Sequence, residues 1–236
     1  EKIVLHQGNS PVNGPHQGAW VDTPDGQDWF LHFQDVGNAG RIIHLQPMHW
    51  ENDWPVIGVN AVDGCGEPTL HYQKPEVGAT YPIDAPEDSD FFEGENLGLQ
   101  WQWNANYKRE WYDLKDGQLL LHAQVADPKT QLCDVSNLLL QKWPAPEFSI
   151  TTCLHLEHMK DGDVAGLVSL GGCYTALAVQ KIHGKTELQQ RTGNWTKDDE
   201  IRTGLGEWNS DVIYIRMKVE KENYRTFYVG TTEENL

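Results

Sequence analysis

The feature that most limits the folds open to this chain is an alternation of apolar and polar residues with a period of two. It is clearest in residues 213–220, which read IYIRMKVE. Successive side chains of a β-strand point to opposite faces, so this pattern predicts a strand with its isoleucine, methionine and valine side chains inward. No segment shows a sustained helical period. The sequence therefore predicts an all-β fold.

A second feature is the repetition of short strand and tight turn near the N-terminus. The turn sequences PDG at residues 24–26 and NAG at residues 38–40 separate β-rich segments, and Pro and Gly fix the φ values that close hairpins. Four antiparallel strands within about 40 residues match the size of one blade of a β-propeller. A lone blade has two faces to bury, so we expect it not to fold alone. The expected strands cover residues 19–23, 29–34, 41–50 and 54–57.

The regular pattern stops after Val59, where glycines and prolines punctuate a stretch that ends in acidic residues. This composition indicates an inter-domain connector. We expect it to lie against the surface, because Leu70, Tyr72 and Tyr81 would serve as apolar anchors. The predicted organisation is a blade at residues 1–60, a connector at residues 61–88 and a β-sandwich at residues 89–236.

Alternation resumes in the expected sandwich, where two packed antiparallel sheets are the natural architecture. Leu99, Trp101 and Trp103 would share one face of an opening strand, and residues 119–125 would form another strand with its leucines, alanine and valine on one face. No obvious closing strand follows the final hairpin, so the sandwich could be incomplete at its C-terminus. Further strands are expected at residues 149–157, 165–170, 175–182, 186–190 and 213–219.

Charge excludes two classes of partner. The formal net charge is -17, so phosphate backbones and anionic lipid headgroups would be repelled. No apolar run approaches the roughly 20 residues that a membrane-spanning helix needs. We therefore expect a soluble protein with no nucleic-acid or membrane partner.

Cysteine and aromatic residues leave alternatives open. Ten Trp and eight Tyr supply flat faces that suit sugars, but β-sheet cores use such side chains too. The four cysteines show no C-x-x-C pairing, and we interpret them as mostly buried thiols, with a bridge between Cys153 and Cys173 left open. Packing within the blade is the preferred interpretation for Trp20, Trp29, Trp50 and Trp54, and core or inter-domain contact for Trp101 and Trp103.

Several separated blocks resemble glycoside hydrolase family 43. Residues 14–26 (GPHQGAWVDTPDG) resemble the start of that family's final propeller blade, and WFLHFQD, LQPMHW and DWPVIG follow in the family's order. Residues 97–104 (LGLQWQWN), 137–142 (NLLLQK) and 159–167 (MKDGDVAGL) resemble its appended concanavalin A-like sandwich. The resemblance implies the final blade of a five-bladed β-propeller followed by a concanavalin A-like (jelly-roll) β-sandwich.

The resemblance also implies an activity. The family typically comprises β-xylosidases and α-L-arabinofuranosidases, so the resemblance implies part of an exo-acting enzyme that cleaves plant hemicellulose by an inverting mechanism. We expect a secreted, periplasmic or cell-surface location. Such a mechanism needs a carboxylic acid and an opposed carboxylate, which in the family come from earlier blades. We therefore expect no catalytic residue within this chain, which alone should be inactive. Solvated turn positions are expected for Asp22, Asp25, Asp28 and Asp35.

Two substrate-binding residues are carried over from the family. His16 matches a histidine at the propeller axis that orients catalytic groups or contacts water around a possible structural calcium; no other cofactor is expected. Arg41 matches an arginine that reaches the sugar pocket, where its planar fork would bind hydroxyls. The alternatives are a structural histidine in a turn and a solvated arginine at a hairpin edge. The expected partners are xylo- or arabino-oligosaccharides and the missing blades or another chain.

Two other classes of function stay open from the sequence. A non-catalytic carbohydrate-binding β-sandwich protein would hold glycan through exposed aromatic side chains. A structural or adhesive module would need no pocket. The sequence Asn194-Trp195-Thr196 matches a glycosylation sequon, which would have no meaning in a bacterial protein.

Overall fold

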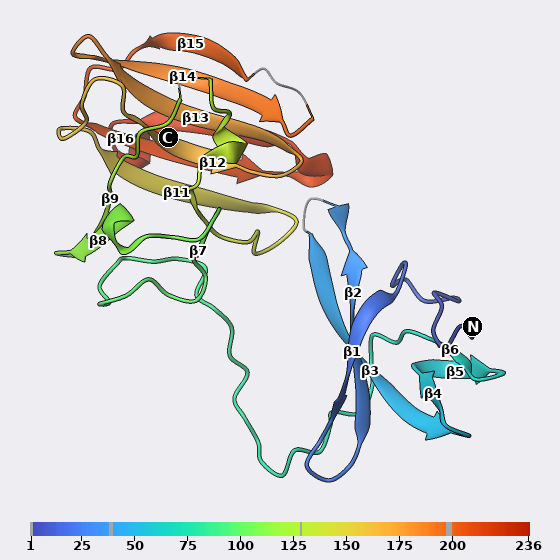
Figure 1. Ribbon diagram of the computed structural model, residues 1–236. Helices are drawn as coiled ribbons and strands as arrows, with labels where there is room; N and C mark the ends of the chain where they lie inside the picture. Colours follow the sequence, from blue (N-terminus) through green and yellow to red (C-terminus); the bar gives the residue numbers. More distant parts are fainter. Residues whose placement is uncertain (1, 38–39, 128, 197–199) are drawn as a thin grey trace. The chain divides into compact units, whose positions relative to one another are not determined.

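The computed structural model describes residues 2–37, 40–127, 129–196 and 200–236 (Figure 1). It forms two compact units, residues 1–84 and 85–236. Strands dominate both units, and the described helical segments are short 3₁₀ turns. The predicted turn at residues 38–40 includes Asn38 and Ala39, which lie outside the described residues.

The first unit contains one four-stranded antiparallel sheet in the order β1-β2-β3-β4. The four strands predicted near the N-terminus are therefore confirmed. Asn52 and Asp53 form the turn between the last two strands with φ values of 50° and 65°, a conformation that Asn and Asp adopt more readily than most residues. The strands are β1 (His16–Asp22), β2 (Asp28–Asp35), β3 (Arg41–Glu51) and β4 (Trp54–Ile57).

A hairpin follows where the sequence predicts an irregular connector. Strands β5 (Val59–Val62) and β6 (Cys65–Glu67) pair antiparallel, so regular structure continues beyond Val59 and into the segment assigned to the connector. Asp63 and Gly64 form its turn with φ values of 52° and 77°. The glycine-rich stretch thus closes a hairpin, whereas our interpretation treated these glycines as breakers of regular structure.

Irregular segments cover parts of the sheet. The fully buried amide of Gln46 donates to the Thr69 carbonyl at 3.2 Å and accepts from the Thr69 N–H at 2.7 Å. Tyr72 lies edge-on to the buried Trp29 with ring centroids 5.8 Å apart. Tyr72 thus contacts the sheet as expected of an anchor, although Tyr72, Leu70 and Tyr81 are all more than half exposed.

The second unit is a β-sandwich of two main antiparallel sheets. One has the strand order β11-β16-β17 and the other β12-β13-β14-β15. Small hairpins and 3₁₀ turns precede and flank these sheets. The elements are β7 (Gln102–Trp103), η2 (Arg109–Trp111), β8 (Tyr112–Lys115), β9 (Gln118–Leu121), η3 (Leu132–Asp134), β10 (Leu139–Leu140), β11 (Phe148–His155), β12 (Val164–Ser169), β13 (Cys173–Ile182), β14 (Lys185–Asn194), β15 (Ile201–Glu207), β16 (Val212–Val219), η4 (Lys221–Asn223), β17 (Arg225–Gly230) and η5 (Glu233–Asn235).

The core of the sandwich lies between these two sheets. Ile213 and Ile215 of β16 are completely buried and cluster with Leu177 and Val179 of β13 and Leu188 of β14. The inward direction predicted for the alternating residues of 213–219 is therefore confirmed. Apolar side chains from both sheets remove each other from water, which is the main stabilising contribution to such a fold.

Two expected strands are shorter than their patterns suggest. Residues 97–101 are not a strand, because the Trp101 N–H donates to the Gly98 carbonyl at 3.2 Å and closes a turn. Leu99 is consequently 94% exposed and does not share a face with Trp101 and Trp103. The strand expected at 119–125 ends at Leu121, and Val125 is fully exposed.

The cysteine thiols are more exposed than the predicted mostly buried state. All four cysteines are free: Cys133 is buried, Cys65 is half-buried, and Cys153 and Cys173 are exposed. The bridge left open between the last two is not formed. Within the described residues, no helix has the length and apolar character needed to cross a membrane.

Candidate functional site

A β-bulge sets the position of His16 at the start of β1. The pairing register between β1 and β2 shifts between His16 and Ala19, and Gln17 has a φ of 48°. A Cβ on Gly18 would lie 2.1 Å from the Leu31 carbonyl oxygen, so only glycine fits this close approach. Bulges redirect side chains at strand ends, and this one directs the imidazole of His16 toward Phe33.

Phe33 brings the two predicted binding residues together. The His16 ring lies edge-on to the Phe33 ring with centroids 4.7 Å apart. The Arg41 guanidinium carbon lies 4.5 Å from the centroid of the same ring, a favourable cation–π distance. His16 and Arg41 are exposed, whereas Phe33 is buried. The imidazole and the guanidinium therefore both contact the ring of Phe33, and no motif in the sequence indicates this role of Phe33.

One ring nitrogen of His16 is already engaged. Its Nδ1 lies 2.5 Å from the Gly14 carbonyl oxygen. A carbonyl only accepts, so Nδ1 carries the proton and Nε2 is the acceptor of the neutral ring. This contact fits the structural alternative, a histidine satisfied within a turn, and equally leaves Nε2 able to accept from a hydroxyl or a water.

A second pair of histidines lies in the same sheet. His32 stacks on His44 with centroids 5.5 Å apart, and His44 Nε2 lies 3.1 Å from the Gln34 side-chain oxygen. Burial lowers the pKa of His32; a hydrogen bond to the Phe33 carbonyl opposes this and the nearby His44 adds to it. The Nε2 atom of His32 is buried without a hydrogen-bond partner, so a proton there would be poorly solvated.

The residues described here do not form a direct calcium site. No three His, Cys, Asp or Glu side chains among them are close enough to hold a metal ion. Calcium prefers oxygen ligands, and His16 offers only an imidazole nitrogen. A calcium that contacts His16 through a water molecule, as the resemblance implies, stays a prediction.

The carboxylates near β1 and β2 lie at strand ends and turns: Asp22, Asp25 and Asp28 at the β1–β2 hairpin and Asp35 at the other end of β2. Asp28 accepts from the Trp20 indole N–H at 2.7 Å, and Asp25 accepts from the Thr23 hydroxyl. Asp22 and Asp35 are exposed at strand ends. These contacts agree with turn carboxylates held by neighbouring side chains.

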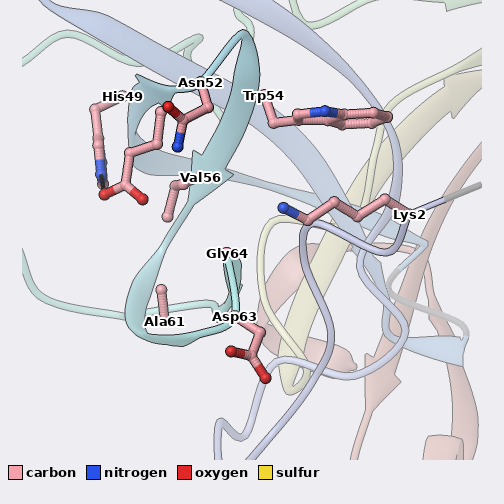
Figure 2. Close-up of a pocket in the computed structure, with 9 residues that line it drawn as sticks. Lys2, His49, Asn52, Trp54, Val56, Ala61, Asp63 and Gly64 are labelled. Atoms are coloured by element: carbon pink, nitrogen blue, oxygen red, sulfur yellow. Dashed lines mark hydrogen bonds and ion pairs between the residues drawn. The ribbon is translucent and has the colours of Figure 1, made fainter.

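A cavity of about 410 Å³ lies at the other end of β3 (Figure 2). Lys2 and Trp54 border it on one side, and His49 and Asn52 on the opposite side. The lining contains one Lys and two carboxylates, from Glu51 and Asp63. Neither His16 nor Arg41 lines this cavity. No sequence motif indicates this cavity, because its walls come from the turns of two separate strand pairs.

The tryptophans of the first unit divide into two groups. Trp29 is 6% exposed, which confirms the packing interpretation for that residue. Trp20 and Trp50 pack edge-on against each other with centroids 5.4 Å apart, yet they are 57% and 45% exposed. Trp54 is 47% exposed and borders the cavity. Trp20 and Trp50 therefore pack against each other as predicted but stay partly exposed, and packing of Trp54 stays a prediction.

The sandwich contains a buried ionic network. The Glu200 side chain is 3% exposed, and its oxygens lie 3.5 Å from Arg191 and 2.7 Å from Arg202. It also accepts from the Tyr174 hydroxyl at 3.0 Å and from the Leu132 N–H at 3.1 Å. Burial and the bond to Glu200 raise the pKa of Tyr174. The network fixes η3 to β13, β14 and β15, so its role is structural.

The fold and the exposed groups together define the class of protein. It is an all-β protein whose C-terminal unit is a concanavalin A-like sandwich. An exposed imidazole and an exposed guanidinium lie on a separate sheet. Residues 89–236 match the family described as Beta xylosidase C-terminal Concanavalin A-like domain, GH43_C2. The chain belongs to this family. The resemblance to glycoside hydrolase family 43 is thereby confirmed, together with the concanavalin A-like fold.

Relatives extend the match beyond the sandwich. A Xylanibacter ruminicola protein provisionally named beta-xylosidase is 43% identical over 185 residues, covering 76% of this chain and 34% of that protein. A beta-xylosidase of Formosa agariphila is 32% identical over 219 residues, covering 79% and 36%. The solved "Bifunctional GH43-CE" of Bacteroides eggerthii is 30% identical with a TM-score of 0.69, covering 94% of this chain and 28% of that one. The chain spans about a third of the length of the curated relatives.

Proposed function

We propose that this chain is the C-terminal portion of an exo-acting glycoside hydrolase that cleaves xylosidic or arabinofuranosidic bonds of plant hemicellulose. Membership of a β-xylosidase C-terminal family is the observation that carries the proposal. Relatives named beta-xylosidase support the same reaction class. The non-catalytic carbohydrate-binding alternative has no comparable support.

The sheet β1 to β4 would be one blade of a five-bladed propeller. Its four-stranded antiparallel order supports this proposal, as do apolar side chains that remain exposed, such as Ile43 at 65% and Trp20 at 57%. Such surface is normally covered by a further layer. The covering layer would come from other blades of the longer protein or from another chain.

In the proposed reaction, a carboxylic acid protonates the leaving oxygen and an opposed carboxylate activates water, with inversion at the anomeric carbon. These carboxylates would lie in the part of the longer protein outside this chain. His16 would orient an ordered water or a protonated carboxyl group by accepting a hydrogen bond at Nε2, because Nδ1 is engaged by the Gly14 carbonyl. Arg41 would donate to sugar hydroxyls, with its guanidinium supported on Phe33.

We also propose a secreted, periplasmic or cell-surface location with hemicellulose oligosaccharides as partners. The support is chemical: a polysaccharide of the plant cell wall is met outside the cell. The net charge of -17 does not oppose a neutral polymer.

The test uses the longer protein that carries this chain, with aryl β-xylosides and aryl α-L-arabinofuranosides as substrates. His16→Ala should lower turnover by about a hundredfold, the loss expected when a reacting group is misplaced, while the thermal unfolding midpoint stays close to that of the parent. Arg41→Lys should mainly raise KM, because the charge remains but the planar fork is lost. A matched control is His6→Ala, an exposed histidine of the same unit.

Product stereochemistry gives a second readout. Proton NMR of the first-formed sugar should show the anomer opposite to that of the substrate. Full activity of His16→Ala would contradict the assigned role of this residue. Absence of hydrolysis of both substrates by the parent protein would contradict the proposed reaction.

A further inference from the structure

The cavity beside Trp54 is built by two hairpins of the first unit. The turn between β3 and β4 contributes Asn52, and the turn between β5 and β6 contributes Asp63 and Gly64. Both turns contain residues with positive φ, so their backbone is held in tight two-residue hairpins. The walls of the cavity therefore belong to well-defined turns on paired strands.

The lining combines an aromatic face with several hydrogen-bonding groups. The Trp54 indole is 47% exposed, and the Lys2 ammonium lies 5.6 Å from its ring centroid. Figure 2 shows the Asn52 amide and the His49 imidazole across from them, with Val56 between the two sides. Most of the nine lining residues are polar or charged, while Trp54 and Val56 supply the large apolar surfaces; polar groups around an aromatic face can fix the orientation of a small ligand.

The charges of the lining select among ligands. The lining carries one ammonium, from Lys2, and two carboxylates, from Glu51 and Asp63, and His49 Nε2 is 2.9 Å from a Glu51 oxygen. An anionic ligand would meet net negative charge here. A neutral polyol can accept from the ammonium and donate to the carboxylates at once.

Size and shape point to a sugar ring. A volume of about 410 Å³ falls at the lower end of the range for ligand pockets. The exposed Trp54 face can pack against the C–H groups of a sugar while the rim binds its hydroxyls. We propose that this cavity binds a neutral pentose unit of hemicellulose; the choice of ligand class rests on the proposed function.

The cavity would anchor the polysaccharide away from His16 and Arg41. Arg41 begins β3, while His49 and Glu51 lie at its other end. Eight residues of extended strand place Arg41 and His49 about 26 Å apart. The two sites are therefore separate positions along a single strand of the same sheet.

The test measures binding to the 236-residue chain by saturation-transfer NMR, with methyl β-D-xyloside, methyl α-L-arabinofuranoside and D-glucuronate as probes. A neutral pentoside should bind and glucuronate should bind at least tenfold more weakly. Trp54→Ala should weaken pentoside binding at least tenfold. Trp195→Ala is the matched control, because Trp195 is also an exposed tryptophan, 63% exposed, and lies in the second unit; its binding should be unchanged.

A second variant tests the lining of the cavity with a substitution that the local backbone accepts. Asn52→Gly removes the amide but suits the turn, because glycine readily adopts the φ of 50° found there; it should also weaken binding. No pentoside binding, binding unaffected by Trp54→Ala and Asn52→Gly, or a preference for glucuronate would each overturn the inference. If the longer protein hydrolyses the substrates but no pentoside binds in this cavity, the inference about the cavity is wrong and the proposed reaction stands. Binding here without hydrolysis supports the cavity and contradicts the proposed reaction.

Discussion

The two units differ in how completely they bury their apolar side chains. In residues 85–236, two sheets face each other and Ile213 and Ile215 are both 0% exposed. In residues 1–84, a single sheet leaves Ile42 45% and Ile43 65% exposed. A sheet needs a second layer to bury its apolar face. The sandwich supplies both layers itself, whereas the four-stranded sheet of the first unit has the β5–β6 hairpin and irregular segments beside it, which leave these isoleucines exposed.

Buried polar groups differ between the units as well. The sandwich buries a carboxylate, Glu200, but surrounds it with Arg191, Arg202 and the Tyr174 hydroxyl. The single sheet buries a histidine, His32, whose Nε2 has no hydrogen-bond partner. A paired buried charge is costly to break, while an unpaired imidazole simply stays neutral. Burial of Glu200 therefore predicts that the stability of the sandwich is sensitive to substitution of its partners. Burial of His32 predicts that the stability of the first unit depends on pH.

The largest expected effect is at Glu200. Glu200→Gln should lower the free energy of unfolding by about 3 to 5 kcal/mol, because Arg191 would remain buried without its counter-charge. Denaturant unfolding measures the change. Glu207→Gln is the control, since Glu207 forms a solvent-exposed pair with Lys185 at 2.9 Å, and water and salt screen such pairs so that they contribute little to stability. Equal effects of the two substitutions would show that the buried network does not hold the sandwich together.

An intermediate effect is expected in the sandwich core. Ile215→Ala should destabilise by about 2 to 5 kcal/mol, because it removes buried methyl groups and leaves a cavity. Ile43→Ala, at a position 65% exposed, should change stability by no more than about 0.5 kcal/mol. Chemical denaturation of both variants tests the contrast between the units. A large loss from Ile43→Ala would mean that the exposed face of the single sheet is covered in solution.

The smallest effect is expected from pH at His32, whose pKa is lowered chiefly by burial. The unfolded chain takes up a proton near the ordinary pKa of about 6.5, while the folded chain does so only at lower pH. Stability of the first unit should therefore fall as pH drops below that value and level off below the folded pKa. Unfolding midpoints between about pH 5 and 8 measure this dependence.

His32→Phe should flatten that dependence, because an aromatic ring without a titrating nitrogen replaces the imidazole beside His44. His71→Gln, at an exposed position of the same unit, should leave the dependence unchanged. An identical pH dependence in the parent and His32→Phe would assign the effect to other groups.

The sequence alone determined the all-β class, the order of the four N-terminal strands and the inward face of residues 213–219. These properties depend on local alternation and turn chemistry, which are written in neighbouring residues. It also pointed to His16 and Arg41 through a family resemblance. It did not identify the hairpin at residues 59–67, because turn glycines and loop glycines look alike without their hydrogen-bond partners.

Only the tertiary structure decided which side chains meet. The Phe33 ring contacts His16 from β1 and Arg41 from β3. The cavity beside Trp54 is lined by two hairpin turns and by Lys2. Glu200 likewise collects partners from strands and a 3₁₀ turn far apart in the sequence. Such contacts depend on strand register and on bulges, since a shift of one residue turns every side chain to the opposite face.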